Sequence, residues 1–232
     1  MNPPPPPPPN IYIVGTQCTG KTTLVNNLRT YFTTTTTTPS PPTPYPQPTF
    51  ITEVARTVLQ THSFTAADVR DPARSLALQR LILAAQAAAE GDALGQATPT
   101  TAGRWFISDR SGADPLAYAL RYVGSSGTRP LLESAEWAVL RERMRGAVVV
   151  VCEASAGVAG WLRDDGVRLM PEDVEEWVGF HEMFCQFLEG EGVEFEVLPA
   201  GVGGHGERVG FVVERWMGRW KGLKEGGGGG RM

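Results

Sequence analysis

The stretch GTQCTGKT, residues 15–22, fits the phosphate-binding pattern GxxxxGK[ST] and constrains the fold more than any other part of the chain. A glycine-bearing loop can turn its backbone N–H groups toward a phosphate, while Lys21 can reach the outer phosphates and the Thr22 hydroxyl can ligate Mg²⁺. The end of the motif would also open a helix, whose N-terminal end attracts anions. The alternative is a chance glycine turn before a helix.

The flanking sequence favours the phosphate-binding interpretation. NIYIV before the motif is a short apolar run typical of a strand, and Leu24, Leu28 and Tyr31 after it have helical spacing. This strand, loop and helix order is the context that the motif requires. The chain has no NKxD guanine signature, so we expect the cofactors to be ATP and Mg²⁺. The residues expected to bind the nucleotide are Gly15, Thr16, Gln17, Cys18, Thr19, Gly20, Lys21, Thr22 and Thr23.

Length and composition limit the classes of protein that fit. A chain of 232 residues with 41% hydrophobic content suits one α/β domain. The net charge of −4 provides no basic field, which disfavours a nucleic-acid partner. The chain has three cysteines and no CxxC pair, which argues against a disulfide framework or a zinc site and fits a reducing compartment. With no secretory signal and no run of membrane-spanning length, the expected location is the cytoplasm.

Low-complexity segments interrupt the chain. Seven consecutive prolines at residues 3–9 predict an extended, disordered leader over residues 1–9, and they could recruit a proline-binding partner. TTTTTTPSPPTPYPQP, residues 33–48, is expected to form a long loop that packs little. A glycine-rich tail is expected over residues 223–232, which leaves residues 10–222 as one P-loop domain with an insert at 33–48.

Strand and helix patterns alternate along the domain. TFIT, RWFISDR, AVVVVCE and VEFEVLP are strand-like, and AVVVVCE is the most apolar of them. Residues 72–90 predict a helix closed by Gly91, and residues 130–144 predict another. A final amphipathic helix is expected through Trp220, before the glycines that begin at Gly226. The alternation predicts a three-layer α/β fold with a parallel sheet.

The strand-like run RWFISDR ends in Asp109 and Arg110. Ligands gather at the carboxyl ends of parallel strands, so Asp109 is the best candidate to orient an acceptor or the water shell of a metal bound at Thr22. The alternative is an ordinary strand-end carboxylate that faces solvent. Glu153, which ends another strand, is a rival acidic partner for the metal.

Four segments together resemble one known family. IYIVGTQCTGKTTL, ITEVAR, ISDRSGADPLAY and WLRDDGVR are similar to segments of the NadR-type P-loop kinase and ATPase domains, typified by the ribosylnicotinamide kinase half of the bacterial regulator NadR. The resemblance covers roughly residues 10–220. The phosphate loop is shared by many families, whereas EVAR and W-x-x-D-D-G-x-R together point to this AAA-type ATP-binding domain.

The resemblance implies a P-loop kinase fold with strand order 2-3-1-4-5, ATP and Mg²⁺ as cofactors, and a nucleoside-like acceptor. It places Glu53, Arg56 and Arg110 among the residues that contact the acceptor, although Glu53 and Arg56 could equally form a surface ion pair. We expect the chain to depart from the family in having no adenylyltransferase or DNA-binding half. It also has Asp109, Arg110 and Ser111 where the bacterial enzymes carry Asp-Thr-Asp.

The segment at residues 160–168 is dense in charge and bracketed by glycines. We expect it to be a small mobile lid that brings the catalytic side chains of Arg163 and Arg168 onto the transferring phosphoryl group. Together with Lys21 and Asp109, these arginines complete the expected catalytic set. The alternative is a solvated loop whose arginines pair with Asp164 and Asp165.

Three functional classes fit the sequence. The leading one is an ATP-dependent kinase of a small, nucleoside-like molecule. The second is a nucleotide-dependent switch or slow NTPase that acts through partner or lipid binding. The third is an interaction protein whose proline and glycine tracts recruit partners while the nucleotide is structural.

Overall fold

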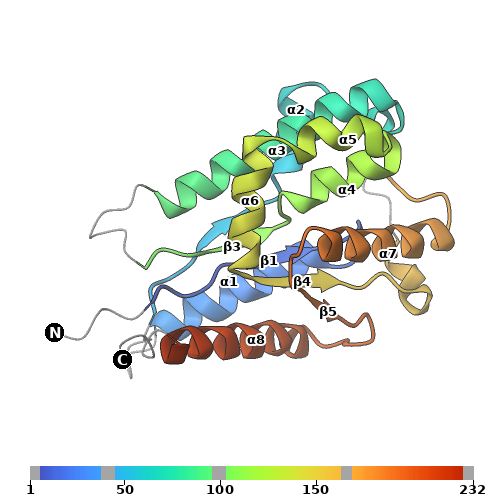
Figure 1. Ribbon diagram of the computed structural model, residues 1–232. Helices are drawn as coiled ribbons and strands as arrows, with labels where there is room; N and C mark the ends of the chain where they lie inside the picture. The colour runs from blue at the N-terminus through green and yellow to red at the C-terminus, as the bar shows by residue number, and fades with distance from the viewer. Residues whose placement is uncertain (1–5, 38–44, 96–102, 163–168, 227–232) are drawn as a thin grey trace.

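The structure is a computed structural model that describes residues 6–37, 45–95, 103–162 and 169–226 (Figure 1). Its centre is a sheet of five parallel strands in the order β2-β3-β1-β4-β5. This confirms the predicted fold class and strand order. The strands are β1 (Ile11–Val14), β2 (Thr49–Ile51), β3 (Phe106–Asp109), β4 (Val148–Cys152) and β5 (Glu196–Leu198).

Helices cover both faces of the sheet (Figure 1). In chain order, the α-helices are α1 (Lys21–Thr37), α2 (Val54–Thr61), α3 (Pro72–Leu94), α4 (Ala113–Tyr122), α5 (Ser125–Leu132), α6 (Ala135–Arg145), α7 (Val174–Gly190) and α8 (His205–Gly226). Two short 3₁₀ helices are η1 (Ala66–Arg70) and η2 (Ala156–Trp161). No helix in these described segments is long and apolar enough to cross a membrane.

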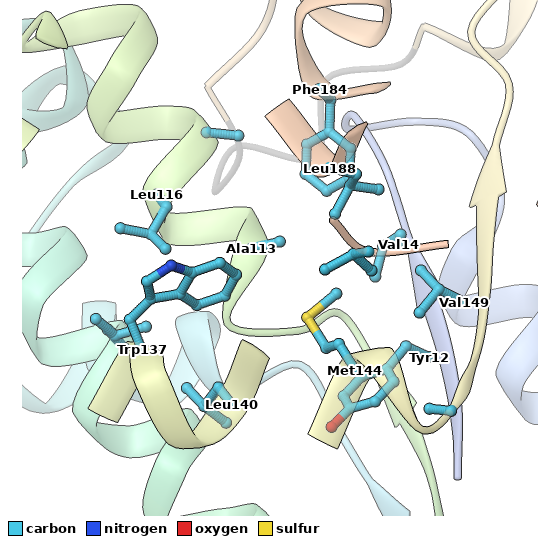
Figure 2. Close-up of a cluster of buried hydrophobic side chains, with 14 of the residues drawn as sticks. Tyr12, Val14, Ala113, Leu116, Trp137, Leu140, Met144, Val149, Phe184 and Leu188 are labelled. Atoms are coloured by element: carbon cyan, nitrogen blue, oxygen red, sulfur yellow. The ribbon is translucent and has the colours of Figure 1, made fainter. Parts of the chain in front are cut away.

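The sheet separates two hydrophobic cores because side chains of a strand alternate between its faces. Tyr12 and Val14 of β1 belong to a core that includes residues of α3, α4, α6 and α7. Ile11 and Ile13 belong to the opposite core, with residues of α1 and α8. Figure 2 shows part of the first core, in which Trp137 and Met144 of α6 lie near the side chains of the sheet and α4. The result is a three-layer arrangement.

Several helix boundaries differ from the sequence expectation. Helix α3 continues past Gly91 to Leu94 and is capped by Gly95, which has φ +64°; Ala93 packs in the core and favours the extra turn. The helix predicted over residues 130–144 is two helices, because Ser134 is extended and its Oγ accepts from Trp137 N to cap α6. Helix α8 reaches Gly226, so the expected tail from residue 223 begins as helix.

The polyproline leader is not wholly unpacked. Pro8 and Pro9 are buried. On α8, the Trp216 indole N–H donates to the Pro9 carbonyl at 2.9 Å, and the Trp220 indole N–H donates to the Pro6 carbonyl at 3.1 Å. The expectation of a disordered leader is therefore wrong for residues 6–9. An extended proline segment leaves its carbonyls without internal partners, and here indole donors satisfy two of them.

The second proline-rich segment packs against the same tryptophans. Trp105 donates its indole N–H to the Pro46 carbonyl at 2.7 Å and stacks on Trp216 with ring centroids 4.8 Å apart. Tyr45 is buried and meets Trp216 edge to face at 4.9 Å. We call Trp105, Trp216 and Trp220, with the three proline carbonyls that they bind, the proline clasp.

Helix α1 also extends into the segment that was expected to be a loop. It continues to Thr37, so residues 33–37 are helical. Threonine hydroxyls bond back to helix carbonyls, as in Thr30 to Asn26 at 3.2 Å and Thr34 to Thr30 at 2.8 Å. These bonds provide partners for threonine hydroxyls within the helix. The loop expectation is wrong for residues 33–37, and the expectation that the segment packs little is wrong for the buried Tyr45.

Candidate functional site

The phosphate loop follows β1 and ends in the first turn of α1. Gly15 has φ +121°, and a Cβ there would lie 2.9 Å from the Cys152 carbonyl oxygen of β4. Gly20 has φ +79°. Both positions therefore require glycine, for close packing and for positive φ. Cys18, in the middle of the loop, also has positive φ, at +59°, which is uncommon for a residue with a side chain.

Side chains from distant helices hold the loop by its carbonyl groups. Trp177 of α7 donates its indole N–H to the Gln17 carbonyl at 2.8 Å, and Arg208 of α8 donates to the Thr19 carbonyl at 3.1 Å. The Lys21 ammonium donates to the Thr16 carbonyl. With these carbonyls bound on the protein side, the loop is fixed in shape before any ligand arrives, which favours phosphate binding.

Lys21 is 5% exposed. Burial, and then the nearby positive charge of Arg110, lower the pKa of Lys21 to about 8. A phosphate at the loop would supply negative charge and raise this pKa again. The lysine therefore has the position and the electrostatics of a phosphate ligand.

Thr22 and Asp109 meet at the start of α1 and the end of β3. The Thr22 hydroxyl donates to Asp109 Oδ2 at 2.6 Å. The other carboxylate oxygen, Asp109 Oδ1, is buried and has no hydrogen-bond partner among the described residues. A hydroxyl and a carboxylate are the hard oxygen donors that suit Mg²⁺, directly or through its water shell. The residues present therefore fit a bound Mg²⁺·nucleotide, whose metal would neutralise phosphate charge.

Arg110 lies at the centre of a buried charge cluster. It has φ +83°, an uncommon conformation for a residue with a side chain. Its Nε donates to Glu53 Oε1 at 2.6 Å, and its Nη1 donates to Asp114 Oδ1 at 3.1 Å and to the Gly15 carbonyl at 3.4 Å. Two carboxylates thus fix one guanidinium beside the phosphate loop.

Glu53 joins this cluster to α2. Its Oε2 accepts from Arg56 Nε at 2.9 Å. Burial raises the pKa of Glu53, but the charges and hydrogen bonds of Arg110 and Arg56 outweigh it and lower the pKa to about 2. Glu53 is therefore an ionised hydrogen-bond acceptor at neutral pH.

A cavity lies directly beside these charges. It encloses about 730 Å³ of space outside the protein atoms, part of it open to solvent. At one end are Gln17 of the phosphate loop, Glu53, Arg110 and Asp114. Its other lining residues are mostly apolar and include Leu59, Val69, Leu78, Ile82, Tyr118 and Leu169.

A second cavity lies on the other side of the loop. Its lining includes Thr23, Trp161, His205 and Arg208. The Arg208 guanidinium lies 5.5 Å from the centre of the Trp161 ring, and its buried Nη1 has no hydrogen-bond partner among the described residues. An aromatic ring, an available donor and the end of the phosphate loop provide groups that can contact the base and sugar of a nucleotide.

The structure brings most of the expected site residues together. The loop residues 15–23, Glu53, Arg56, Asp109 and Arg110 converge at the carboxyl ends of β1 and β3. Glu153 does not join them through its carboxylate, because Oε2 accepts from Ala200 N at 2.7 Å and holds the β5–α8 loop. Arg163 and Arg168 lie outside the described residues.

Sequence reasoning missed three residues of the site. Asp114 accepts a hydrogen bond from Arg110, and Tyr118 donates to Gln17 Oε1 at 3.0 Å. Arg208 contacts the loop across 189 residues of sequence. The segment SDRSGAD carried a local signal for Asp114, because a carboxylate four residues after an arginine can pair with it on one helical turn. Nothing local indicates Arg208.

A family model described as an AAA domain matches residues 10–208. The chain belongs to this AAA-domain family. No curated protein sequence matches the chain.

Solved structures share the architecture of this AAA domain. It is similar to the NadR protein in complex with NR, with a TM-score of 0.58 and 21% identity over 91% of this chain. It is also similar to deoxyadenosine kinase from M. mycoides with bound dATP (TM-score 0.57, 14% identity, 89% of this chain and 98% of that one). Thymidylate kinase from Candida albicans gives a TM-score of 0.51 at 14% identity, over 91% of this chain and 92% of that one.

These similarities establish the fold of the AAA domain. The match covers 52% of the NadR chain, so the AAA domain corresponds to about half of that protein. The NadR match agrees with the family resemblance in the sequence, and the shared fold includes the parallel sheet and its strand order.

Proposed function

We propose that the protein is an ATP-dependent kinase that transfers the γ-phosphate to a small, nucleoside-like acceptor. The observation that carries this proposal is the cavity that begins at Gln17 of the phosphate loop and continues between apolar walls. A site for ATP alone needs no such second space. A molecule in this cavity would present one end to the phosphates and bury the rest.

The cavity divides into two chemical regions, which supports the choice of acceptor. At its charged end, Glu53 and Asp114 can accept a hydrogen bond from a hydroxyl group, and Arg110 can donate one to it. Its apolar region, with the ring of Tyr118 among the lining residues, can hold a flat ring system. A sugar hydroxyl joined to a ring is the simplest molecule that satisfies both regions.

Each residue has a specific role in this proposal. Lys21 binds the outer phosphates, and Thr22 with Asp109 holds the Mg²⁺ and its water shell. Glu53 accepts a hydrogen bond from the acceptor hydroxyl and orients it. The transition state of phosphoryl transfer requires mainly positioning and charge neutralisation. Glu53, with a pKa of about 2, can therefore orient the acceptor hydroxyl without removing its proton before the phosphoryl group is transferred.

Acceptor-dependent release of ADP tests the proposal. Purified protein with Mg²⁺·ATP is assayed against a panel of nucleosides, with a thermal-shift measurement for each. A kinase releases ADP only when an acceptor is present, and Glu53→Gln should lower kcat by at least about tenfold while ATP affinity is kept. Lys21→Ala should lose ATP binding and keep its fold.

Two results would contradict the proposal. Hydrolysis of ATP at one rate regardless of the acceptor would identify a slow NTPase or a switch, which acts through a partner or a lipid. Filling the cavity by Leu78→Trp without any effect on acceptor-dependent turnover would place the acceptor elsewhere. Gly218→Ala, at an exposed position of α8 where a Cβ meets no neighbour within 4 Å, is the control for a substitution away from this cavity.

A further inference from the structure

A buried polar network beside the cavity is centred on α3 and joins it to β1, β3 and α6. Glu90 of α3 is fully buried, and three donors converge on its carboxylate. Tyr12 donates its hydroxyl to Oε2 at 2.8 Å, Arg143 approaches Oε2 at 3.4 Å, and Gln86 donates Nε2 to Oε1 at 3.0 Å. Burial raises the pKa of Glu90, and these hydrogen bonds to the ionised form oppose that shift.

Gln86 is the member of this network that lines the cavity. Its side-chain nitrogen is fully committed, because Nε2 donates to Glu90 Oε1 and also to Ser108 Oγ at 3.1 Å. Its side-chain oxygen, Oε1, is buried and has no hydrogen-bond partner among the described residues. A buried acceptor without a partner costs free energy unless a ligand supplies a donor.

Glu90 determines which end of the Gln86 carboxamide is available. The opposite orientation would place Gln86 Oε1 against Glu90 Oε1, two acceptors in contact. The carboxylate therefore holds the nitrogen on its own side, and the buried oxygen is left without a partner in the described part of the protein. A carboxamide that could turn over would accept either kind of ligand group, whereas a fixed one selects a donor.

We propose that Gln86 selects acceptor molecules that carry an N–H or O–H donor, such as an exocyclic amino or amide group, at the end that enters the cavity, and that Glu90 is the positioning residue that fixes this choice. This selection rests on the proposed function and specifies the chemistry of the acceptor. A molecule of the same shape without the donor leaves Gln86 Oε1 unpaired and binds more weakly.

Two pairs of nucleosides test the selection. Adenosine and purine riboside differ by one amino group, and so do cytidine and pyrimidin-2-one riboside. The measurement is kcat/KM for acceptor-dependent ADP release, with the thermal shift for each nucleoside as a direct readout of binding. In the wild-type protein, at least one pair should show a preference of about tenfold or more for the amino compound.

Gln86→Met keeps the length of the side chain and removes the acceptor, so the preference should fall to about one. Gln79→Met is the matched control, because Gln79 also lies on α3, lines the same cavity and is 2% exposed. It should keep the preference. A preference that survives in Gln86→Met, or one that disappears only in Gln79→Met, overturns the assignment to Gln86.

Glu90→Gln tests the positioning role and does not depend on the folding of the Gln86 variant. Tyr12 and Arg143 both donate at the Oε2 position, so the amide oxygen of the new side chain should lie there and its nitrogen should face Gln86. The Gln86 carboxamide should then turn over and present its N–H groups to the cavity. The preference for the amino compound should fall below one, and an unchanged preference contradicts the role of Glu90.

The selection by Gln86 and the kinase activity can fail separately. If ATP stabilises the protein but none of the four nucleosides does, the selection by Gln86 is wrong while nucleotide binding stands. If the nucleosides bind with the expected preference but no ADP is released, the selection stands and the kinase activity is wrong.

Discussion

The hydroxyl of Thr22 and the carboxylate of Asp109 are joined by a hydrogen bond of 2.6 Å, although 87 residues separate them in the sequence. This contact brings the first turn of α1 to the end of β3. Within the described part of the chain it also leaves Asp109 Oδ1 as a buried oxygen without a hydrogen-bond partner, beside the loop that would hold the phosphates.

Asp109→Asn should keep ATP binding and lose most of the turnover, by about 10²-fold or more, because an amide cannot supply the negative charge that orients the metal and its water shell. Single-turnover assays over a range of Mg²⁺ concentrations measure this. Glu153→Gln is the matched control, since it also changes a carboxylate after a strand and should leave turnover near the wild-type rate. Normal turnover in Asp109→Asn would contradict the assignment.

The affinity for ATP should fall as the pH rises above about 8. The pKa of Lys21 in the free protein is about 8, and only the ammonium form binds phosphate strongly, so the affinity should fall by about tenfold per pH unit. Binding near pH 8 should be accompanied by proton uptake. Isothermal titration calorimetry in two buffers of different ionisation enthalpy measures that uptake.

The same pKa has an opposite effect on the stability of the free protein. Lys21 has a pKa of about 8 in the folded state against the ordinary lysine value of 10.5, so the unfolded chain binds more protons between these limits. Its contribution therefore makes the free protein more stable as the pH rises from 8 to 10.5. Lys21→Met should remove this contribution, and the same pH profile in both proteins would show that another group is responsible.

Removal of residues 1–9 should destabilise the protein. The two indole hydrogen bonds to Pro6 and Pro9, together with the burial of Pro8 and Pro9, should contribute about 2–4 kcal/mol, which lowers Tm by about 5–15 °C. Trp216→Phe should have part of this effect, because it keeps the ring and loses the N–H. Removal of residues 1–5 alone spares the clasp and is the control. An unchanged Tm after removal of residues 1–9 would show that the clasp adds no stability.

Arg168→Ala should lower kcat by about 10²-fold or more with a much smaller change in ATP affinity, if residues 160–168 form a lid that closes on the transferring phosphoryl group. Arg168→Lys should recover only part of the rate, because lysine lacks the planar fork. Single-turnover rates of Arg163→Ala and Arg168→Ala measure the effect. Normal rates in both would remove the lid from the mechanism.

Local patterns were sufficient to predict the phosphate loop and the layers of the fold. Gly15, Lys21 and Thr22 lie within one short motif, and the apolar runs on either side identify a strand and a helix. The placement of Asp109 followed from a general rule about strand ends, whereas its direct bond to Thr22 is a tertiary contact.

The proline clasp shows why the low-complexity segments were misjudged. Composition predicts that such segments cannot form a core of their own, and this holds for each segment in isolation. Tyr45 and Pro9 are nevertheless buried. Trp105, just before β3, packs against Tyr45, and Trp216 of α8 contacts both Tyr45 and Pro9. Arg208 was missed for the same reason: its partner in the phosphate loop is distant in sequence and no motif links the two.

The clasp also determines what the intrinsic fluorescence of this protein reports. Of the six tryptophans, Trp105, Trp216 and Trp220 belong to the clasp, while Trp161 lines the second cavity and Trp177 holds the phosphate loop. Emission from the unmodified protein therefore mixes detachment of the leader with occupation of the nucleotide site. A variant with phenylalanine at the three clasp positions would leave Trp161 and Trp177 as the optical reporters of ATP binding, with Trp137 as a constant background in the core.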